Sequence, residues 1–151
     1  MENEVLKFED VLNRDGFLIF PNKGGSMLPL IRQGKDLMVI EKISEKPQLF
    51  DAVLFRRGNG QYVLHRIMRE CDGGYFIIGD SCTEGEFVNE SQIIGKLSAV
   101  IRGGKRLEVS DLKYKSYVLL IRCCDPFRKP VIAVLSRIHV ISKKLKKKAP
   151  V

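Results

Sequence analysis

Ser26 carries a hydroxyl in a setting that suits a nucleophile. It follows two glycines in residues 24–29 (Gly-Gly-Ser-Met-Leu-Pro), so the backbone can take a tight path, and Pro29 fixes the chain as it leaves. A serine on such a turn exposes its hydroxyl beside backbone N–H groups, here those of Gly25 and Ser26. These are the requirements for a nucleophile next to an oxyanion site. Taken alone, Gly-Gly-Ser is more often an ordinary loop.

The chain has two histidines, and their surroundings differ. His65 lies in residues 62–67 (Tyr-Val-Leu-His-Arg-Ile), which are typical of a strand, and a neutral imidazole on a rigid strand suits a general base near neutral pH. His139 lies in a basic segment without an acidic neighbour, which indicates a surface or packing role. Because Val63 and Ile67 share its face of the strand, His65 alone is equally well explained as a core histidine.

Asp80 follows a glycine at the end of an apolar segment, residues 77–80 (Ile-Ile-Gly-Asp). A carboxylate at a strand end could orient an imidazole and stabilise its charged form, as in a catalytic triad. The alternative is a turn in which the aspartate bonds the neighbouring backbone.

Several segments of the chain resemble, in the same order, the sequence boxes of signal peptidase I. They are residues 25–29 (the Ser-Met-x-Pro nucleophile box), 33–40 (the strand after it), 49–55 (Gly-Asp-x-Val-x-Phe, with Phe50 in the glycine position), 62–67 (the general-base box), 78–80 (Gly-Asp) and 93–97 (Gly-Lys-Val). Bacterial members carry lysine as the base, whereas the archaeal and endoplasmic-reticulum types carry histidine before arginine. With His65 before Arg66, this chain is similar to the second kind.

The resemblance implies a serine endopeptidase that cleaves a leader or signal segment from a precursor peptide. It assigns Ser26 as the nucleophile, His65 as the general base and Asp80 as the acidic residue. The histidine type often has a second acidic residue a few positions further on, for which Glu86 is the best candidate, with Glu84 behind it. The substrate is expected to bind as an extended strand, and no metal or other cofactor is expected.

Two features depart from the family pattern. Gly24 stands where many bacterial members carry a hydroxyl that supports the oxyanion, so a modest or substrate-assisted reaction is expected. The acidic residues 1–10 stand where the family has a membrane span, and neither a signal peptide nor an apolar segment of about 18 residues is present. The expected location is the cytoplasm, with at most peripheral attachment to a membrane.

The hydropathy pattern predicts a mainly β protein. Short apolar segments between glycine turns indicate a compact antiparallel β domain over residues 1–110, which includes a helix over residues 4–13. By the resemblance, this domain has the fold shared by signal peptidases and self-cleaving repressors. Residues 111–151 are expected to form a helical, basic extension. The expected strands are residues 17–20, 37–40, 52–55, 62–68, 75–78, 97–101 and 106–109, and the expected helices of the extension are 113–124 and 131–147.

The net charge of +8 points to partners of opposite charge. The amphipathic helix expected over residues 131–147 has a basic face, so residues 131–148 are candidates for contact with an anionic membrane surface or an export complex. The alternative is that this helix packs on the β domain. Nucleic acid is the least favoured partner, because the basic residues lack interleaved aromatic side chains.

The four cysteines include no Cys-x-x-Cys pair, so reduced thiols rather than a zinc site are expected.

Two other functions fit the same residues. A non-catalytic peptide-binding module would keep the fold without the chemistry. A self-cleaving peptidase of the repressor type would share the serine box, but such proteins use a lysine base and carry a DNA-binding domain, and the sequence indicates neither.

Overall fold

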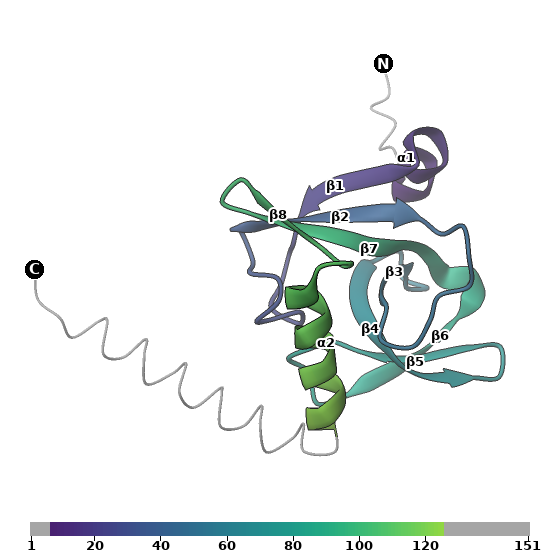
Figure 1. Cartoon of the computed structure of the whole chain (residues 1–151). Coiled ribbons are helices and arrows are strands. Elements are labelled where there is room, and N and C mark those ends of the chain that lie inside the picture. Colours follow the sequence, from purple (N-terminus) through teal and green to yellow (C-terminus); the bar gives the residue numbers. More distant parts are fainter. Residues whose placement is uncertain (1–6, 126–151) are drawn as a thin grey trace, which may run out of the picture.

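The computed structural model describes residues 7–125, which form one antiparallel sheet with a helix at each end (Figure 1). The helices are α1 (Phe8–Asp15) and α2 (Leu112–Cys124). The strands are β1 (Phe17–Pro21), β2 (Asp36–Lys42), β3 (Ala52–Arg56), β4 (Tyr62–Cys71), β5 (Gly74–Ile78), β6 (Gly85–Asn89), β7 (Ile93–Arg102) and β8 (Lys105–Glu108), with a short 3-10 helix, η1 (Glu90–Gln92), before β7. The prediction of a mainly β, antiparallel fold with helices at both ends is confirmed.

Strand β7 joins the two halves of the sheet. The strand order is β1-β2-β7-β3-β4-β5-β6, and β8 also pairs with β7. On one side β7 pairs with β2, whereas on the other side its first residues pair with β3 and its last residues with β8. The sheet therefore curls, with β1 and β2 at one end and β5 and β6 at the other (Figure 1).

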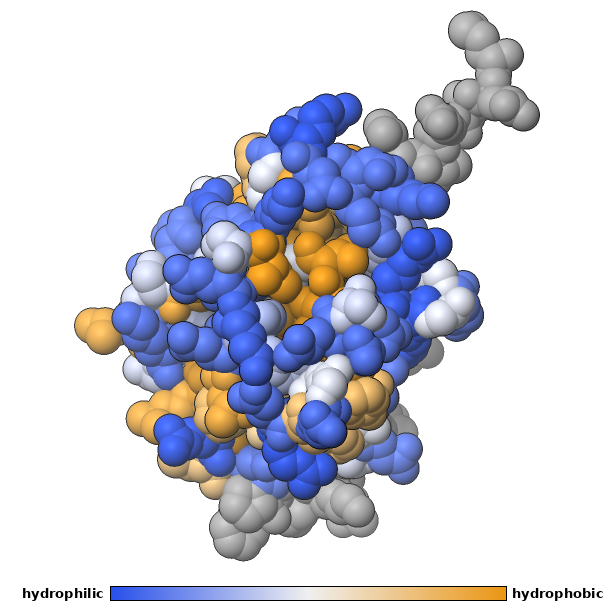
Figure 2. Space-filling model, turned by 90° about the vertical axis from the view of Figure 1, so that its right-hand side faces the viewer, coloured by the Kyte–Doolittle hydropathy of each residue, from blue (hydrophilic) through white to orange (hydrophobic). Residues whose placement is uncertain are grey.

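Alternation along the strands divides the buried side chains into two apolar clusters. On β3, Ala52 and Leu54 belong to the larger cluster, and Val53 and Phe55 belong to the smaller one. The larger cluster also receives side chains from both helices and from the loop after β1 (Leu12, Tyr114, Met27 and Ile31). On one face of the molecule, hydrophobic residues lie in a hollow rimmed by hydrophilic ones (Figure 2).

The sequence prediction missed β6. Residues 85–89 (Gly-Glu-Phe-Val-Asn) mix two apolar side chains with a glycine and polar residues, which is typical of a turn. They form the edge strand next to β5, where Phe87 is 55% exposed and only Val88 is buried. The result matters for the site, because β6 carries Glu86.

Helix α2 packs on the β domain and does not stand apart from it. Its first turn contributes Tyr114, only 6% exposed, to the larger apolar cluster. The helix and basic face expected over residues 131–147 lie outside the described residues. Within residues 7–125, neither helix has the length and apolar character that a membrane crossing requires. None of the four cysteines, all of which lie within residues 7–125, forms a disulfide.

Gly95 on β7 provides a test of this packing. A Cβ at position 95 would lie 2.4 Å from the Cγ2 atom of the buried Ile40 and 3.0 Å from the Glu41 carbonyl oxygen. We expect Gly95→Ala to lower the free energy of unfolding by about 1–3 kcal/mol, because a packed core resists added volume. Chemical denaturation measures the loss. The matched control is Gly58→Ala, whose Cβ would meet nothing within 4 Å, and equal stability of the two variants would contradict the packing described.

Candidate active site

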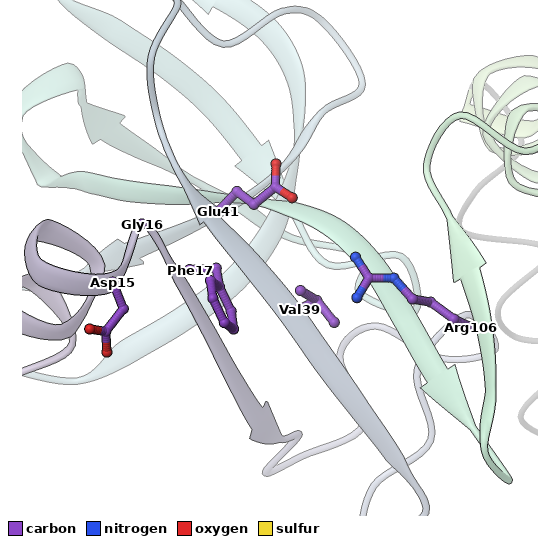
Figure 3. A pocket seen from close by; sticks show the side chains of 6 residues that line it. All are labelled: Asp15, Gly16, Phe17, Val39, Glu41 and Arg106. Atoms are coloured by element: carbon purple, nitrogen blue, oxygen red, sulfur yellow. The ribbon is translucent and has the colours of Figure 1, made fainter.

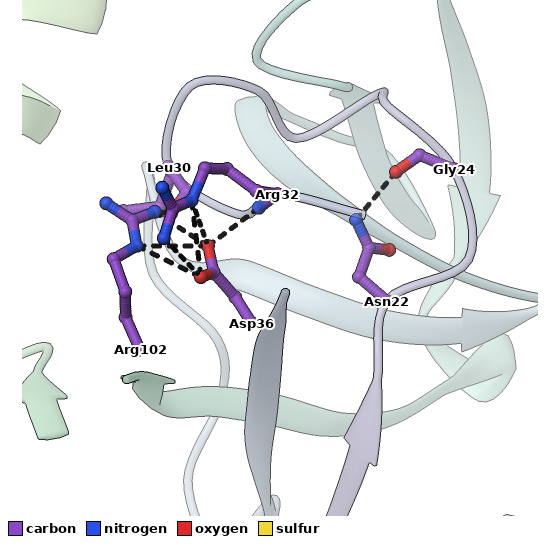
Figure 4. Close-up of polar contacts among 6 residues, drawn as sticks. All are labelled: Asn22, Gly24, Leu30, Arg32, Asp36 and Arg102. Carbon is purple, nitrogen blue, oxygen red and sulfur yellow. Dashed lines mark hydrogen bonds and ion pairs between the residues drawn. The ribbon is translucent and has the colours of Figure 1, made fainter. Parts of the chain in front are cut away.

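Ser26 lies in the loop of residues 22–35, which connects β1 to β2. The Asn22 amide donates a hydrogen bond of 2.8 Å to the Gly24 carbonyl and closes the start of the loop (Figure 4). Gly24 has a φ of 120°, a conformation that glycine adopts without strain. Met27, 1% exposed, anchors the backbone just after the serine in the larger apolar cluster. The tight path predicted before Ser26 is therefore present.

Asp36 holds the other end of this loop. Its buried carboxylate accepts hydrogen bonds from the Arg32 backbone N–H at 2.8 Å and from Arg102 Nη2 at 2.7 Å, and Arg102 also donates to the Leu30 carbonyl (Figure 4). Burial opposes ionisation of Asp36, but the hydrogen bonds from the two arginines outweigh it and hold the pKa of this carboxyl well below its ordinary value. The loop is thus fixed at both ends while Ser26 lies between them.

Ser81, in the turn after β5, clamps the backbone on both sides of the Ser26 nitrogen. Its N–H donates to the Ser26 carbonyl over 2.9 Å, and its hydroxyl donates to the Gly25 carbonyl over 2.6 Å. Because a peptide group is planar, fixing the Gly25 carbonyl also fixes the direction of the Ser26 N–H. Among the described residues, neither this N–H nor the Ser26 hydroxyl has a hydrogen-bond partner, so both are available to a substrate.

Ser26 packs directly against Gly79. A Cβ added at Gly79 would lie 2.7 Å from the Ser26 carbonyl oxygen and 2.9 Å from the Ser26 Cβ. Real side-chain carbons do not approach so closely, so the serine can occupy its position only because residue 79 has no side chain.

The sheet register places His65 across from this contact. Strands β4 and β5 pair Arg66 with Ile78, so extending the antiparallel register by one residue sets His65 opposite Gly79. Directly opposed residues of an antiparallel pair project to the same face. Ser26 packs on the face of Gly79 that a side chain would occupy, and this is the face to which His65 projects. The chain thus brings the predicted nucleophile and the predicted base to one face of the β4–β5 pair.

The His65 ring is enclosed and lacks a hydrogen bond at Nδ1. The residue is 8% exposed, and its Nδ1 has no hydrogen-bond partner within residues 7–125. The nearest carboxylate oxygen, Glu86 Oε1, lies 3.7 Å from Nδ1, beyond hydrogen-bond length. Burial lowers the pKa of His65 below its ordinary value, although the negative charge of Glu86 opposes the shift. The imidazole is therefore neutral at neutral pH, the form that a general base requires.

Arg57 holds Glu86 beside the imidazole. The Arg57 Nε donates to Glu86 Oε2 over 2.9 Å, and its Nη2 forms a second bond to Oε1. These two hydrogen bonds fix the plane of the carboxylate. The positive charge of Arg57 also partly neutralises the negative charge that Glu86 presents to His65. Sequence reasoning did not single out Arg57. It follows the end of β3, whereas Glu86 lies on β6, and no motif spacing connects the two residues.

Asp80 does not contact His65, and the prediction that it orients the imidazole is corrected. The Asp80 carboxylate accepts two hydrogen bonds of 2.7 Å from Arg66 and one of 2.8 Å from the Tyr117 hydroxyl. The Asp80 carboxylate is therefore engaged by Arg66 and Tyr117. The carboxylate beside His65 is that of Glu86, the second candidate from the sequence.

Arg66 and two tyrosines of α2 complete a buried polar network that the sequence did not reveal. The Arg66 side chain is fully buried, and it donates to the Phe50 carbonyl over 2.7 Å and to the Tyr114 hydroxyl over 3.2 Å. Burial raises the pKa of Tyr117, so its hydroxyl keeps its proton and acts as a donor to Asp80. The network ties β4, the turn after β5 and α2 together behind the Ser26–His65 face.

A separate cavity of about 400 Å³ lies near the start of β1 (Figure 3). None of Ser26, His65 and Glu86 lines it, so it is not part of this site. Its lining consists of Asp15, Gly16, Phe17, Val39, Glu41 and Arg106.

Neither a family model nor a curated protein matches this chain. Within residues 7–125, no group of three or more His, Cys, Asp or Glu side chains is arranged to hold a metal ion. The groups that the site itself brings together are a hydroxyl, a neutral imidazole, a carboxylate and a directed backbone N–H.

The lowered pKa of His65 predicts a pH dependence of stability. Its pKa is near 6.5 in the unfolded chain and lower in the folded protein, so below pH 6.5 the unfolded chain binds a proton that the folded protein does not. We expect the free energy of unfolding to fall as the pH drops below 6.5. The measurement is chemical denaturation between about pH 7 and 5, above the range in which carboxylates titrate. His65→Gln should flatten this slope and His139→Gln should not; equal slopes for the wild type and His65→Gln would contradict the burial described.

Proposed function

We propose that this chain is a serine endopeptidase that removes a leader or signal segment from a precursor peptide. The observation that carries the proposal is the contact of Ser26 with Gly79 on the face to which His65 projects. It supports the pairing of a constrained serine with a neutral, buried imidazole from a distant strand. The resemblance of the same segments to signal peptidase I supports the choice of peptide bonds as substrate.

In this mechanism His65 is the general base. Its Nδ1 faces Glu86, so the proton of the neutral ring is placed on Nδ1 and Nε2 is left to accept the proton of the Ser26 hydroxyl. The Ser26 Oγ then attacks the peptide carbonyl, and the imidazolium returns its proton to the leaving amine. Glu86 stabilises the imidazolium by its charge. Water releases the acyl group by the reverse sequence, which regenerates the free hydroxyl.

The oxyanion is stabilised by backbone donors at Ser26. Its N–H is free and is directed by the clamp that Ser81 places on the Gly25 carbonyl. Gly24 supplies no hydroxyl at the position where many bacterial members have one, so one donor of the family pattern is missing. Each such donor contributes about 10²- to 10³-fold in rate, and turnover is accordingly expected to be modest.

The substrate would lie as an extended strand against the site, with small residues before the scissile bond as the family resemblance implies. An enzyme that acts on small precursor peptides fits the resemblance. A non-catalytic peptide-binding module is favoured by one observation, because Arg57 draws charge from Glu86 and leaves His65 Nδ1 without a hydrogen bond.

Covalent labelling distinguishes the enzyme from the binding module. A serine-directed fluorophosphonate probe should label the wild type at Ser26, as peptide mass spectrometry would show. We expect Ser26→Ala to abolish labelling and His65→Ala to slow it by at least about 10³-fold, because the hydroxyl loses its base. Ser116→Ala and His139→Ala are the matched controls and should label like the wild type. Labelling that survives Ser26→Ala, or that is unaffected by His65→Ala, would refute the proposal.

The role of Ser81 in directing the oxyanion donor has its own test. We expect Ser81→Ala to reduce kcat for cleavage of a leader-bearing peptide by about 10²-fold with little change in KM, since the donor serves the transition state. Ser81→Thr keeps the hydroxyl and should restore most of the rate. Thermal unfolding of the two variants is the control for stability. A loss that appears in KM alone, or equal rates for the Ala and Thr variants, would contradict this role.

A further inference from the structure

Helix α2 presents apolar side chains on two opposite faces. Tyr114 and Tyr117 face inward, where they meet Arg66 and Asp80. A helix advances about 100° per residue, so residues 112 and 119 lie about 160° and 140° from Tyr114, on the far side, and residue 120 lies about 120° from Tyr114, at the edge of that side next to Lys113. Leu112, Leu119 and Leu120 are 81%, 58% and 59% exposed. Three large leucines of α2 are therefore exposed to solvent, while the other face of the helix packs on the β domain.

Basic side chains flank this outer stripe on both sides. By the same helical geometry, Lys113 lies on one border, and Lys115 and Arg122 lie on the other. All three are exposed, and within residues 7–125 neither lysine takes part in an ion pair. The Arg122 guanidinium lies over the Phe50 ring, 5.5 Å from its centroid, so the two lysines are the charges best placed to meet a partner. Long basic side chains beside an apolar stripe keep their charges in water while the stripe is buried, as in helices that lie in a lipid interface.

The charge of the chain is concentrated just beyond α2. Residues 126–151 contain eight Lys and Arg and no Asp or Glu, whereas residues 1–125 contain 18 of each sign. The whole net charge of +8 therefore follows directly on the end of this helix. An anionic partner that attracts the C-terminal residues is held by a segment that follows α2 directly in the sequence.

We infer that the outer face of α2, formed by Leu112, Leu119 and Leu120 between its basic borders, docks on the interface of an anionic lipid bilayer. The three leucines supply the apolar area that enters the interface, and the basic borders match the anionic headgroups. The chain's own C-terminal segment is disfavoured as the occupant, because its charged residues are all basic and carry the same sign as the borders of the stripe, even though residues 131–135 are apolar. A second copy is disfavoured as well, because a twofold contact through this stripe would bring lysine against lysine.

The docking places the described domain at a set orientation to the bilayer. The inner face of α2 holds Asp80 through Tyr117, and Ser81, which follows Asp80, clamps the Ser26 backbone. A protein bound through the outer face would therefore keep its Ser26 turn at a fixed height above the membrane. The inference does not depend on Ser26 being a nucleophile, since binding is measured without any peptide.

The first test measures binding of the full chain to vesicles. We expect cosedimentation with phosphatidylcholine vesicles that contain phosphatidylglycerol, little binding to pure phosphatidylcholine, and weaker binding at high salt. Replacing both Leu119 and Leu120 by Gln should weaken partitioning by about tenfold or more, because the lost apolar area no longer enters the interface. Phe17→Gln, which removes a half-exposed apolar residue from β1, is the control and should bind like the wild type.

A second test reports where α2 lies. The chain contains no tryptophan, so Leu120→Trp gives a single fluorophore on the stripe and Phe17→Trp gives one on the far strand. With anionic vesicles, the first should shift to shorter wavelength and be quenched by brominated acyl chains, and the second should not. Wild-type binding by the double Gln variant, or absence of quenching in Leu120→Trp, would overturn the inference. So would leucine-dependent dimerisation in sedimentation velocity without vesicle binding.

Discussion

The buried ion pair between Arg66 and Asp80 is the interaction on which the rest of the site depends. Both side chains are fully removed from solvent, and Arg66 satisfies the carboxylate with two hydrogen bonds of 2.7 Å. Taking these charges out of water is costly, so each requires the other in place. The pair fixes the turn after β5 against β4, and the Tyr117 hydroxyl of α2 donates a hydrogen bond to the same Asp80 carboxylate. The turn that supports the serine is thus held from two sides by charge-assisted hydrogen bonds.

Three successive residues of that turn then have three distinct roles. Gly79 leaves room for the serine, Asp80 anchors the turn to the interior, and Ser81 holds the serine backbone by two hydrogen bonds. These residues follow β5 in a turn that the hydrogen bond from the Cys82 N–H to the Gly79 carbonyl closes. One short segment therefore supplies both the anchor in the interior and the support of the serine backbone.

The sequence predicted the strands with clear apolar runs and the two residues that the proposed chemistry needs, Ser26 and His65. It misassigned Asp80, because a place in a motif does not say which side chains a carboxylate will meet, and the partners of Asp80 lie 14 and 37 residues away along the chain. It missed β6, since an edge strand with one buried residue has no strong hydropathy signal. Arg57 and Tyr117 were missed for another reason: their partners are 29 and 37 residues away, and only the folded chain brings them together.

The change in charge balance at the end of α2 affects how the protein approaches charged partners. The first 125 residues carry equal numbers of acidic and basic side chains, and every unbalanced positive charge lies after them. The positive charge that acidic residues do not balance is therefore confined to one segment of the sequence. A negatively charged surface attracts that segment over distances longer than those of any contact. Long-range attraction then acts first, and the shape of the contacting surfaces acts only afterwards.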